Sequence, residues 1–363
     1  MNFEKRIDKL IKLIEQKELD AVILGGRANI RYFTGLRFNT AAFSILFVSK
    51  DRDIEFLIPV LDYKRVKKTC WIKNIKKFPE DDPNYLKPLE QILAGRDIKR
   101  IGVEFSQVNM ERETLIKKET NAQLINVESD LLRLRAIKDK QEIELIRISA
   151  QIADKAMNEA IKSLRPGIKE YQISAIAQDV MMKSGAEGLS FEPFVMTGEN
   201  AWLPQRFSTE KEFKKGELAI FDMGCIYKGY CSDITRTFSL GDLSEKQKHL
   251  FKTAYESQQE ALKALKPGVI AEDIHKIAKN VAIQNGYGDF FPHLTGHGIG
   301  LDEHEEPIID EGRKMILEPG MVVTIEPGIY VEGVGAARIE DMVLITDTGY
   351  ELLTNTPRDL INC

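Results

Sequence analysis

The stretch FDMGCIYKGYCSDITRTF, residues 221–238, decides the interpretation of this chain. Apolar and β-branched residues on both sides of a turn at residues 227–229 predict two short strands. The pattern nevertheless places Asp222 and Asp233 where a buried strand favours valine or isoleucine. Two carboxylates in an apolar hairpin need a cation, a shared proton or full exposure to water.

The register of this hairpin decides whether the carboxylates meet. A turn centred between Tyr227 and Lys228 places Asp222 directly opposite Asp233, with Cβ atoms roughly 4.5–5.5 Å apart. Like charges so placed destabilise the strand pair, and the apolar segment LAIFDMG argues against full exposure. The alternative is that both aspartates cap loops beside the turn.

Length and composition describe a soluble globular protein of two domains. The chain has 363 residues, and a single hydrophobic core stops growing at about 250–300 residues. Hydrophobic residues make up 43% and charged residues 29% of the chain, as is usual for globular proteins. A net charge of −5 gives no support for a nucleic-acid partner, and no apolar run approaches the about 18 residues of a membrane span.

The N-terminus and the cysteines bear on location. Ile7, Leu10, Ile11 and Ile14 have helical spacing, and the charges between them distinguish this amphipathic segment from a signal peptide. The four cysteines include no CxxC motif, which argues against a disulfide framework or a zinc knuckle. A cytoplasmic location is therefore expected.

The first third of the chain alternates predicted strands and helices. Strand patterns cover 20–26, 41–50, 53–60 and 98–105, and helical patterns cover 62–68, 85–95 and 109–118. This alternation predicts an α/β domain over residues 1–130. Asp139 and Glu142 then form a predicted capping box that begins a helix running to about Leu164, within a second domain over residues 131–363.

The second domain contains an internal repeat. Residues 159–185 and 260–286 align without gaps at an offset of 101, and both contain a helix, a Pro-Gly break and a second helix. The hairpin at 221–238 therefore predicts a counterpart at a similar distance.

That counterpart is TIEPGIYVEGVGAARIEDMVLIT, residues 324–346, in which Glu326 and Glu340 lie symmetrically about Gly333. Two half-domains related by a pseudo-twofold axis would bring four carboxylates together. Only multivalent cations make such a concentration of negative charge tolerable.

Three of the five histidines lie in one glycine-rich stretch, HLTGHGIGLDEH, as His293, His297 and His304. Glycines let the backbone approach closely and leave room for a bound group, which fits a binding site better than a core. The other two histidines lie in helical sequence and are interpreted as core residues. The stretch lacks the Lys-Ser/Thr of a phosphate loop, and HExxH does not occur.

Taken together, FDMGCIYKGYCSDITRTF, HLTGHGIGLDEHEEP, TIEPGIY and ARIEDMVLIT resemble the pita-bread metallopeptidase family, in its prolidase and Xaa-Pro aminopeptidase branch. The resemblance covers essentially the whole chain. It implies an α/β creatinase-like N-terminal domain and an α+β pita-bread catalytic domain with a pseudo-twofold repeat. The implied activity is hydrolysis of the bond before proline, in Xaa-Pro dipeptides or, alternatively, in longer peptides. A third alternative is a catalytically weak or non-catalytic peptide-binding relative.

By this resemblance, two divalent metal ions are bound by Asp222, Asp233, His297, Glu326 and Glu340. Asp233 and Glu340 would bridge the ions, Asp222 would hold one, and His297 with Glu326 would hold the other. Such an oxygen-rich set suits manganese or cobalt, with zinc or iron possible.

The resemblance also implies catalytic roles. Glu326 is the candidate base and proton shuttle. His304 would stabilise the tetrahedral intermediate, and His293 would line the substrate pocket. Tyr230 and Thr235 would orient the metal ligands, although both also suit ordinary strand positions.

Two residues are expected to bind substrate. Arg338 lies on the same strand face as Glu340, where it would order the carboxylates and meet a substrate carboxylate. Gln205 stands where the family usually has histidine, and glutamine donates hydrogen bonds but carries no proton. The expected partners are peptides with proline at the second position and a second copy of the chain, with no nucleic acid and no membrane.

Overall fold

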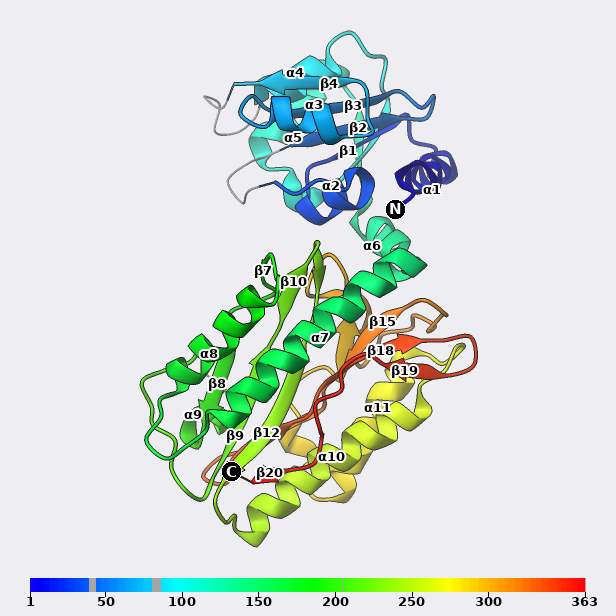
Figure 1. Ribbon diagram of the computed structural model, residues 1–363. Coiled ribbons are helices and arrows are strands. Elements are labelled where there is room, and N and C mark those ends of the chain that lie inside the picture. The colour runs from blue at the N-terminus through cyan, green and yellow to red at the C-terminus, as the bar shows by residue number, and fades with distance from the viewer. Residues whose placement is uncertain (39–43, 80–85, 205, 363) are drawn as a thin grey trace. The chain divides into compact units, whose positions relative to one another are not determined.

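The computed structural model describes residues 1–38, 44–79, 86–204 and 206–362 (Figure 1). It divides into two compact units, Met1–Arg135 and Ala136–Cys363. The boundary expected near residue 130 falls within helix α6 (Glu128–Ala136). In the part of the chain that is described, no helix combines the length and the apolar character that crossing a bilayer requires.

The first unit is built on a six-stranded mixed sheet in the order β4-β3-β2-β1-β5-β6. Its strands are β1 (Ala21–Leu24), β2 (Ile45–Ser49), β3 (Ile54–Pro59), β4 (Ile75–Phe78), β5 (Arg100–Val103) and β6 (Gln123–Asn126). Its helices are α1 (Phe3–Gln16), α2 (Arg27–Thr34), α3 (Tyr63–Thr69), α4 (Leu86–Leu93) and α5 (Met110–Thr120). Within the described residues the predicted strands and helices all form, and residues 41–43 and 85 of two predicted segments lie outside them; α2, β4 and β6 were not predicted.

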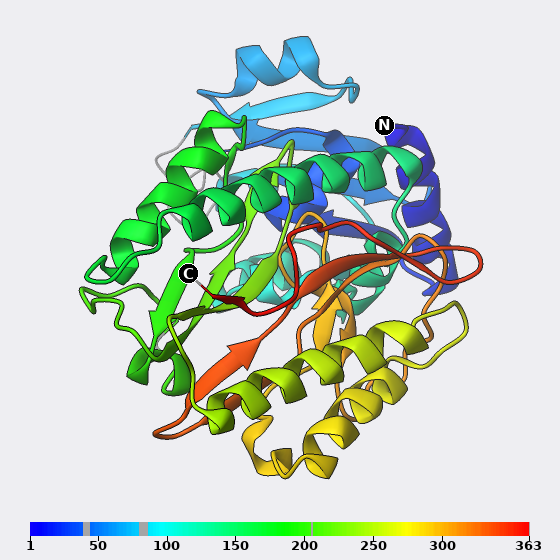
Figure 2. The ribbon, with the colours of Figure 1, turned by 60° about the horizontal axis from the view of Figure 1, so that its bottom comes forward.

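The second unit contains two helix pairs, α7 (Lys140–Lys162) with α8 (Glu170–Lys183), and α10 (Glu245–Ala264) with α11 (Ala271–Gln284). The second helices of the pairs lie at the predicted offset of 101 at both ends. The capping box at the start of α7 is confirmed, because Asp139 accepts hydrogen bonds from the first turn and Glu142 accepts one from the backbone of Asp139. Figure 2 shows the two pairs flanking the strands between them.

Those strands belong to two larger sheets and two small ones. The order β20-β12-β9-β8 joins β8 (Phe194–Thr197), β9 (Glu217–Met223), β12 (Ile234–Leu240) and β20 (Ile361–Asn362). The order β14-β13-β15-β18-β19 joins β13 (Gly296–Gly298), β14 (Glu305–Ile309), β15 (Val322–Ile325), β18 (Asp341–Ile345) and β19 (Tyr350–Leu352). The small sheets contain β7 (Gly188–Leu189), β10 (Cys225–Tyr227) and β11 (Tyr230–Cys231), and β16 (Gly328–Val331) with β17 (Gly335–Arg338). A short helix, α9 (Glu199–Trp202), follows β8.

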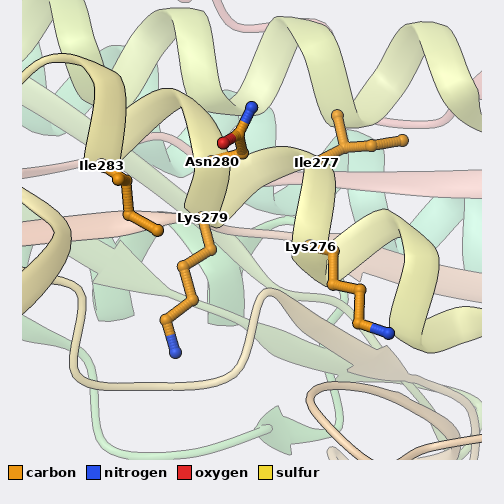
Figure 3. Close-up of a pocket in the computed structure, with 5 residues that line it drawn as sticks. All are labelled: Lys276, Ile277, Lys279, Asn280 and Ile283. Carbon is orange, nitrogen blue, oxygen red and sulfur yellow. The ribbon is translucent and has the colours of Figure 1, made fainter.

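Helix α11 carries a surface hollow lined by Lys276, Ile277, Lys279, Asn280 and Ile283 (Figure 3). All five side chains project from this one helix, so the hollow belongs to a single helix face. None of these residues lines the cavity that contains the predicted ligands.

Candidate metal centre

The first hairpin closes on a shorter turn than the sequence suggested. Tyr227 pairs directly with Tyr230, so Lys228 and Gly229 alone form the turn. Both have positive φ angles, 46° for Lys228 and 95° for Gly229. Two left-handed residues are typical of the type I′ turn, whose twist matches the flanking strands.

This turn corrects the predicted register. Asp222 pairs with Thr235, so the expected direct opposition of Asp222 and Asp233 is wrong. The centre of the turn lies one residue further along the chain than expected, and the pairing therefore moves by two residues. Because side chains alternate between faces, Asp233 still lies on the same face as Asp222, as its diagonal neighbour.

The second hairpin has the predicted register. Gly328 pairs with Arg338 in the small sheet, and Ile325 pairs with Asp341 in the larger one, so both pairs are symmetric about Gly333. Glu326 and Glu340 occupy the break between the two sheets, where strand pairing passes from one to the other.

The two hairpins and β13 bring three predicted ligands together. One ligand atom each from Asp233, His297 and Glu340 lies within 4.8 Å of the other two, and all three residues are buried. The Nε2 atom of His297 lies 3.3 Å from Glu326 Oε1 and 3.7 Å from Asp233 Oδ2. Asp222 lines the same cavity as Asp233, His297 and Glu326.

Unpartnered oxygen atoms indicate that this cluster suits a cation. Asp222 Oδ1, Asp233 Oδ1 and Glu340 Oε1 are buried and have no hydrogen-bond partner among the described residues. Buried polar atoms are nearly always hydrogen-bonded or coordinated. Carboxylate oxygens with one imidazole nitrogen are ordinary ligands of divalent transition metals, so the residues present fit such an ion.

The electrostatics of the cluster favour positive charge. Burial raises the pKa of Asp233 well above its usual range, and the carboxylates of Glu340 and Glu326 raise it further. Burial, followed by the charge of Glu326, raises the pKa of Glu340 to about 7. Burial opposes protonation of His297, but the Glu326 carboxylate raises its pKa overall. A bound cation stabilises the ionised carboxylates and reverses this trend.

Arg338 is engaged by its neighbours on every nitrogen of its guanidinium group. Nη2 donates to Asp222 Oδ2, Nη1 donates to the Tyr330 hydroxyl at 2.9 Å, and Nε donates to the Thr235 hydroxyl at 3.2 Å. Burial lowers the pKa of Arg338 to about 10. The predicted ordering of the carboxylates by Arg338 therefore has a visible basis in its contact with Asp222.

Strand β12 ties the first hairpin to the second. The Thr235 hydroxyl donates to Glu340 Oε2 at 2.8 Å, which is the contact expected of a residue that orients a ligand. Thr237 exchanges hydrogen bonds with the backbone of Arg338 at 2.8 and 2.9 Å. Between them, Arg236 forms an ion pair with Asp341 at 2.7 Å, and both side chains are at most 1% exposed.

This ion pair was not predicted from the sequence. In TRT and IED, the charged residues Arg236 and Asp341 alternate with the threonines and with Glu340, so alternation places them on the opposite face of their strands. This alternation is the sequence pattern from which the pairing of the two charged residues could have been predicted.

The glycines beside His297 serve close backbone packing. A Cβ atom on Gly296 would lie 2.0 Å from the carbonyl oxygen of Thr324, and one on Gly298 would lie 2.2 Å from that of Glu306. The expectation that these glycines leave room for a bound group is therefore wrong at both positions, because the backbone of neighbouring strands fills that space.

A cavity of about 600 Å³ opens over four of the predicted ligands, Asp222, Asp233, His297 and Glu326. Its apolar lining includes Phe191, Phe194, Met196, Pro204, Pro292 and Leu294. His293, which was expected to line the substrate pocket, and His304 both line it, and so do Glu303 and Arg206, which were not predicted from the sequence. Gln205 lies outside the described residues.

The two cavity histidines outside the predicted ligand set, His293 and His304, have different surroundings. His304 stacks on His297 with ring centroids 3.9 Å apart, and its Nδ1 lies 3.3 Å from Glu303 Oε1. Partial burial, followed by the charge of His297, lowers the pKa of His304. His293 Nε2 lies 3.1 Å from the Tyr330 hydroxyl.

Tyr230, which was expected to orient the metal ligands, also contacts helix α7. The hydrogen bond described for it runs from its hydroxyl to Glu142 at 3.0 Å, at the start of α7. Its aromatic ring packs in a cluster with Ile146 and Ile299.

The chain matches two family models. The model described as metallopeptidase family M24 matches residues 144–347, and that of the creatinase/prolidase N-terminal domain matches residues 6–137.

Several known proteins are similar along their whole length. The chain is 35% identical to an Xaa-Pro dipeptidase of Pyrococcus horikoshii, over 98% of this chain and 99% of the relative. The solved prolidase structure of Pyrococcus horikoshii has a TM-score of 0.90 and 33% identity, covering 98% of this chain and 100% of that chain. An X-Pro aminopeptidase structure of Thermotoga maritima has a TM-score of 0.87 and 30% identity, covering 98% of this chain and 99% of that chain.

Proposed function

The chain belongs to metallopeptidase family M24, and on that premise we propose that it hydrolyses the peptide bond before proline, with Xaa-Pro dipeptides as its main substrates. The observation that supports this most strongly is the set of three buried, unpartnered carboxylate oxygens on Asp222, Asp233 and Glu340, two of which belong to residues clustered with His297. We further propose that Asp222, Asp233, His297, Glu326 and Glu340 hold two divalent ions, manganese or cobalt in preference to zinc or iron.

Divalent ions held there would lower the pKa of a water molecule and polarise the carbonyl of the scissile bond. Glu326 is the proposed proton carrier, because its Oε1 already faces His297 and accepts a hydrogen bond from the Thr324 hydroxyl at 3.3 Å. From that position its carboxylate takes the proton of the attacking water and passes it to the leaving proline nitrogen.

The histidines of the cavity act on the substrate. His304 is proposed to stabilise the negative charge that develops on the carbonyl oxygen, because stacking on His297 fixes its ring beside the ligand cluster. His293 is proposed to orient the bound peptide, with its own ring held by the hydroxyl of Tyr330.

The apolar part of the cavity suits the proline ring. Phe191, Phe194 and Pro292 supply surface that a pyrrolidine ring covers without leaving polar atoms unpaired. A related dipeptidase and a related aminopeptidase both match this chain over nearly its full length. The preference between dipeptides and longer peptides is therefore tested by comparing one substrate of each length.

The direct test compares Ala-Pro with Ala-Pro-Ala at equal concentration, using protein loaded with Mn²⁺. A higher kcat/KM for Ala-Pro supports the dipeptidase proposal, and a higher value for Ala-Pro-Ala supports the aminopeptidase alternative. Hydrolysis of neither peptide would favour the third alternative, a relative that binds peptides without cleaving them.

Location and assembly stay predictions. A cytoplasmic location is expected from the amphipathic N-terminal sequence, and cell fractionation tests it. A homodimer is expected from the family resemblance, and light scattering of the purified protein measures it.

A further inference from the structure

Two arginines occur among the described residues that line the cavity, and they differ in what they contact. Arg338 is 11% exposed at its side chain and donates to Asp222, Tyr330 and Thr235. Its guanidinium is therefore committed to holding a predicted ligand and the strands around it.

Arg206 is exposed at the cavity, and no hydrogen bond or ion pair joins it to any residue of the described ranges. Its backbone has a positive φ of 57°, which is uncommon for a residue other than glycine, and such strain often marks a functional position.

The charge of Arg206 acts on both sides of the cavity. Burial is the main cause of the lowered pKa of His304, and Arg206 adds to it. Burial is also the main cause of the lowered pKa of Arg338, to which Arg206 again contributes. The guanidinium therefore lies within electrostatic range of the reacting groups.

The rest of the charged lining repels a carboxylate. Apart from the predicted ligands, the cavity is lined by the acidic residues Glu192, Glu303 and Asp310. Because the hydrogen bonds of Arg338 already engage its guanidinium, an anionic group of a substrate is attracted to Arg206.

We infer that Arg206 binds the C-terminal carboxylate of an Xaa-Pro dipeptide and so determines the preference for dipeptides, an inference that rests on the proposed function. In a dipeptide this carboxylate lies on the proline itself, directly after the scissile bond. In a longer peptide the same position holds a neutral peptide group, which gains nothing from a guanidinium. Arginine suits this role because its planar group binds carboxylates through two hydrogen bonds.

The test compares Ala-Pro with its C-terminal amide, Ala-Pro-NH2, which differs only in that carboxylate. The proteins are the full chain loaded with Mn²⁺, Arg206→Gln, Arg206→Lys, and Arg313→Gln as a control. Arg313 is an exposed arginine of the same unit that does not line the cavity, so its loss changes the net charge equally.

We expect Arg206→Gln to lower the ratio of kcat/KM for Ala-Pro over that for Ala-Pro-NH2 by about 10-fold, mainly through KM, because a charge-assisted hydrogen bond is lost. Arg206→Lys should recover part of the ratio, and Arg313→Gln should keep all of it. Thermal melting and Mn²⁺ content verify that each variant is folded and loaded.

Hydrolysis of both peptides with the same ratio in the parent protein and Arg206→Gln would overturn the inference and leave the proposed function standing. Failure of the Mn²⁺-loaded parent protein to hydrolyse either peptide would overturn the proposed function and this inference with it.

Discussion

The two hairpins of the second unit come from one repeat, yet they present their carboxylates differently. Asp222 and Asp233 are diagonal neighbours across a two-residue turn, whereas Glu326 and Glu340 lie symmetrically about Gly333. The second helices of the repeat, α8 and α11, keep an offset of 101 residues, but Asp222 and Glu326 are 104 residues apart and Asp233 and Glu340 are 107 apart. The second helices therefore keep their length and spacing, while the segments that carry the carboxylates differ in length.

The difference shows that neither hairpin completes the site alone. The first hairpin supplies Thr235, which fixes Glu340 of the second, and the second supplies Arg338, which contacts Asp222 of the first. Substitutions that act on one hairpin, or on the contacts between them, test this reciprocal arrangement.

The largest effect is expected at Glu340, because it is the proposed bridge between the ions. Glu340→Ala should lower kcat/KM for Ala-Pro by at least about 10³-fold, since metal ions contribute several kcal/mol to such reactions. Glu332→Ala provides the control, because Glu332 is an exposed glutamate in the turn of the same hairpin. Unchanged activity of the Glu340→Ala protein would contradict the proposal that Glu340 bridges the ions.

The next effect concerns stability. Arg236→Met removes the more deeply buried of the two arginines that pair with Asp341 and leaves Arg358, and breaking this buried pair should cost about 3 kcal/mol of unfolding free energy. Urea unfolding measures it against the exposed control Arg313→Met. Equal stability of the two variants would show that the ion pair does not hold the hairpins together.

A smaller effect separates two threonines of β12. Thr235→Val removes the hydrogen bond to Glu340 and the one accepted from Arg338 Nε, and should lower metal affinity or activity by about 10- to 100-fold. Thr237→Val removes only bonds to the backbone of Arg338 and should change activity less. Metal titration and steady-state kinetics measure both variants. A larger loss in Thr237→Val than in Thr235→Val would contradict the assignment of Thr235 as the residue that orients Glu340.

The smallest effect is expected at the turns. Gly229→Ala and Gly333→Ala place a Cβ atom at positive φ, and each should lower the unfolding free energy by about 1 kcal/mol. A Cβ atom on Gly333 would meet no atom within 4 Å, so its cost is one of backbone conformation alone. Thermal melting that is unchanged in both variants would show that neither turn depends on glycine.

The sequence predicted the helices of the repeat and the second register because these depend on local patterns. The Pro-Gly breaks define the helix ends, and the glycine at 333 defines a symmetric loop. The first register was wrong by two residues, because Lys228 gives no sign of the left-handed conformation that a two-residue turn requires.

Contacts between distant segments were harder to predict. Arg206 and Glu303 line the cavity because separate loops meet over the ligands, and no spacing within either loop encodes that meeting. The pair of Arg236 and Asp341 has an alternating pattern, but its partners are 105 residues apart.

The central claim is that residues of both hairpins together hold metal ions that the reaction requires. The most direct measurement is Mn²⁺ titration of chelator-treated protein, following heat of binding and Ala-Pro hydrolysis on the same samples. We predict no hydrolysis before the addition of metal, two equivalents bound, and activity that returns with binding in the parent protein but not in Glu340→Ala. Full hydrolysis of Ala-Pro by the metal-free protein would contradict the claim.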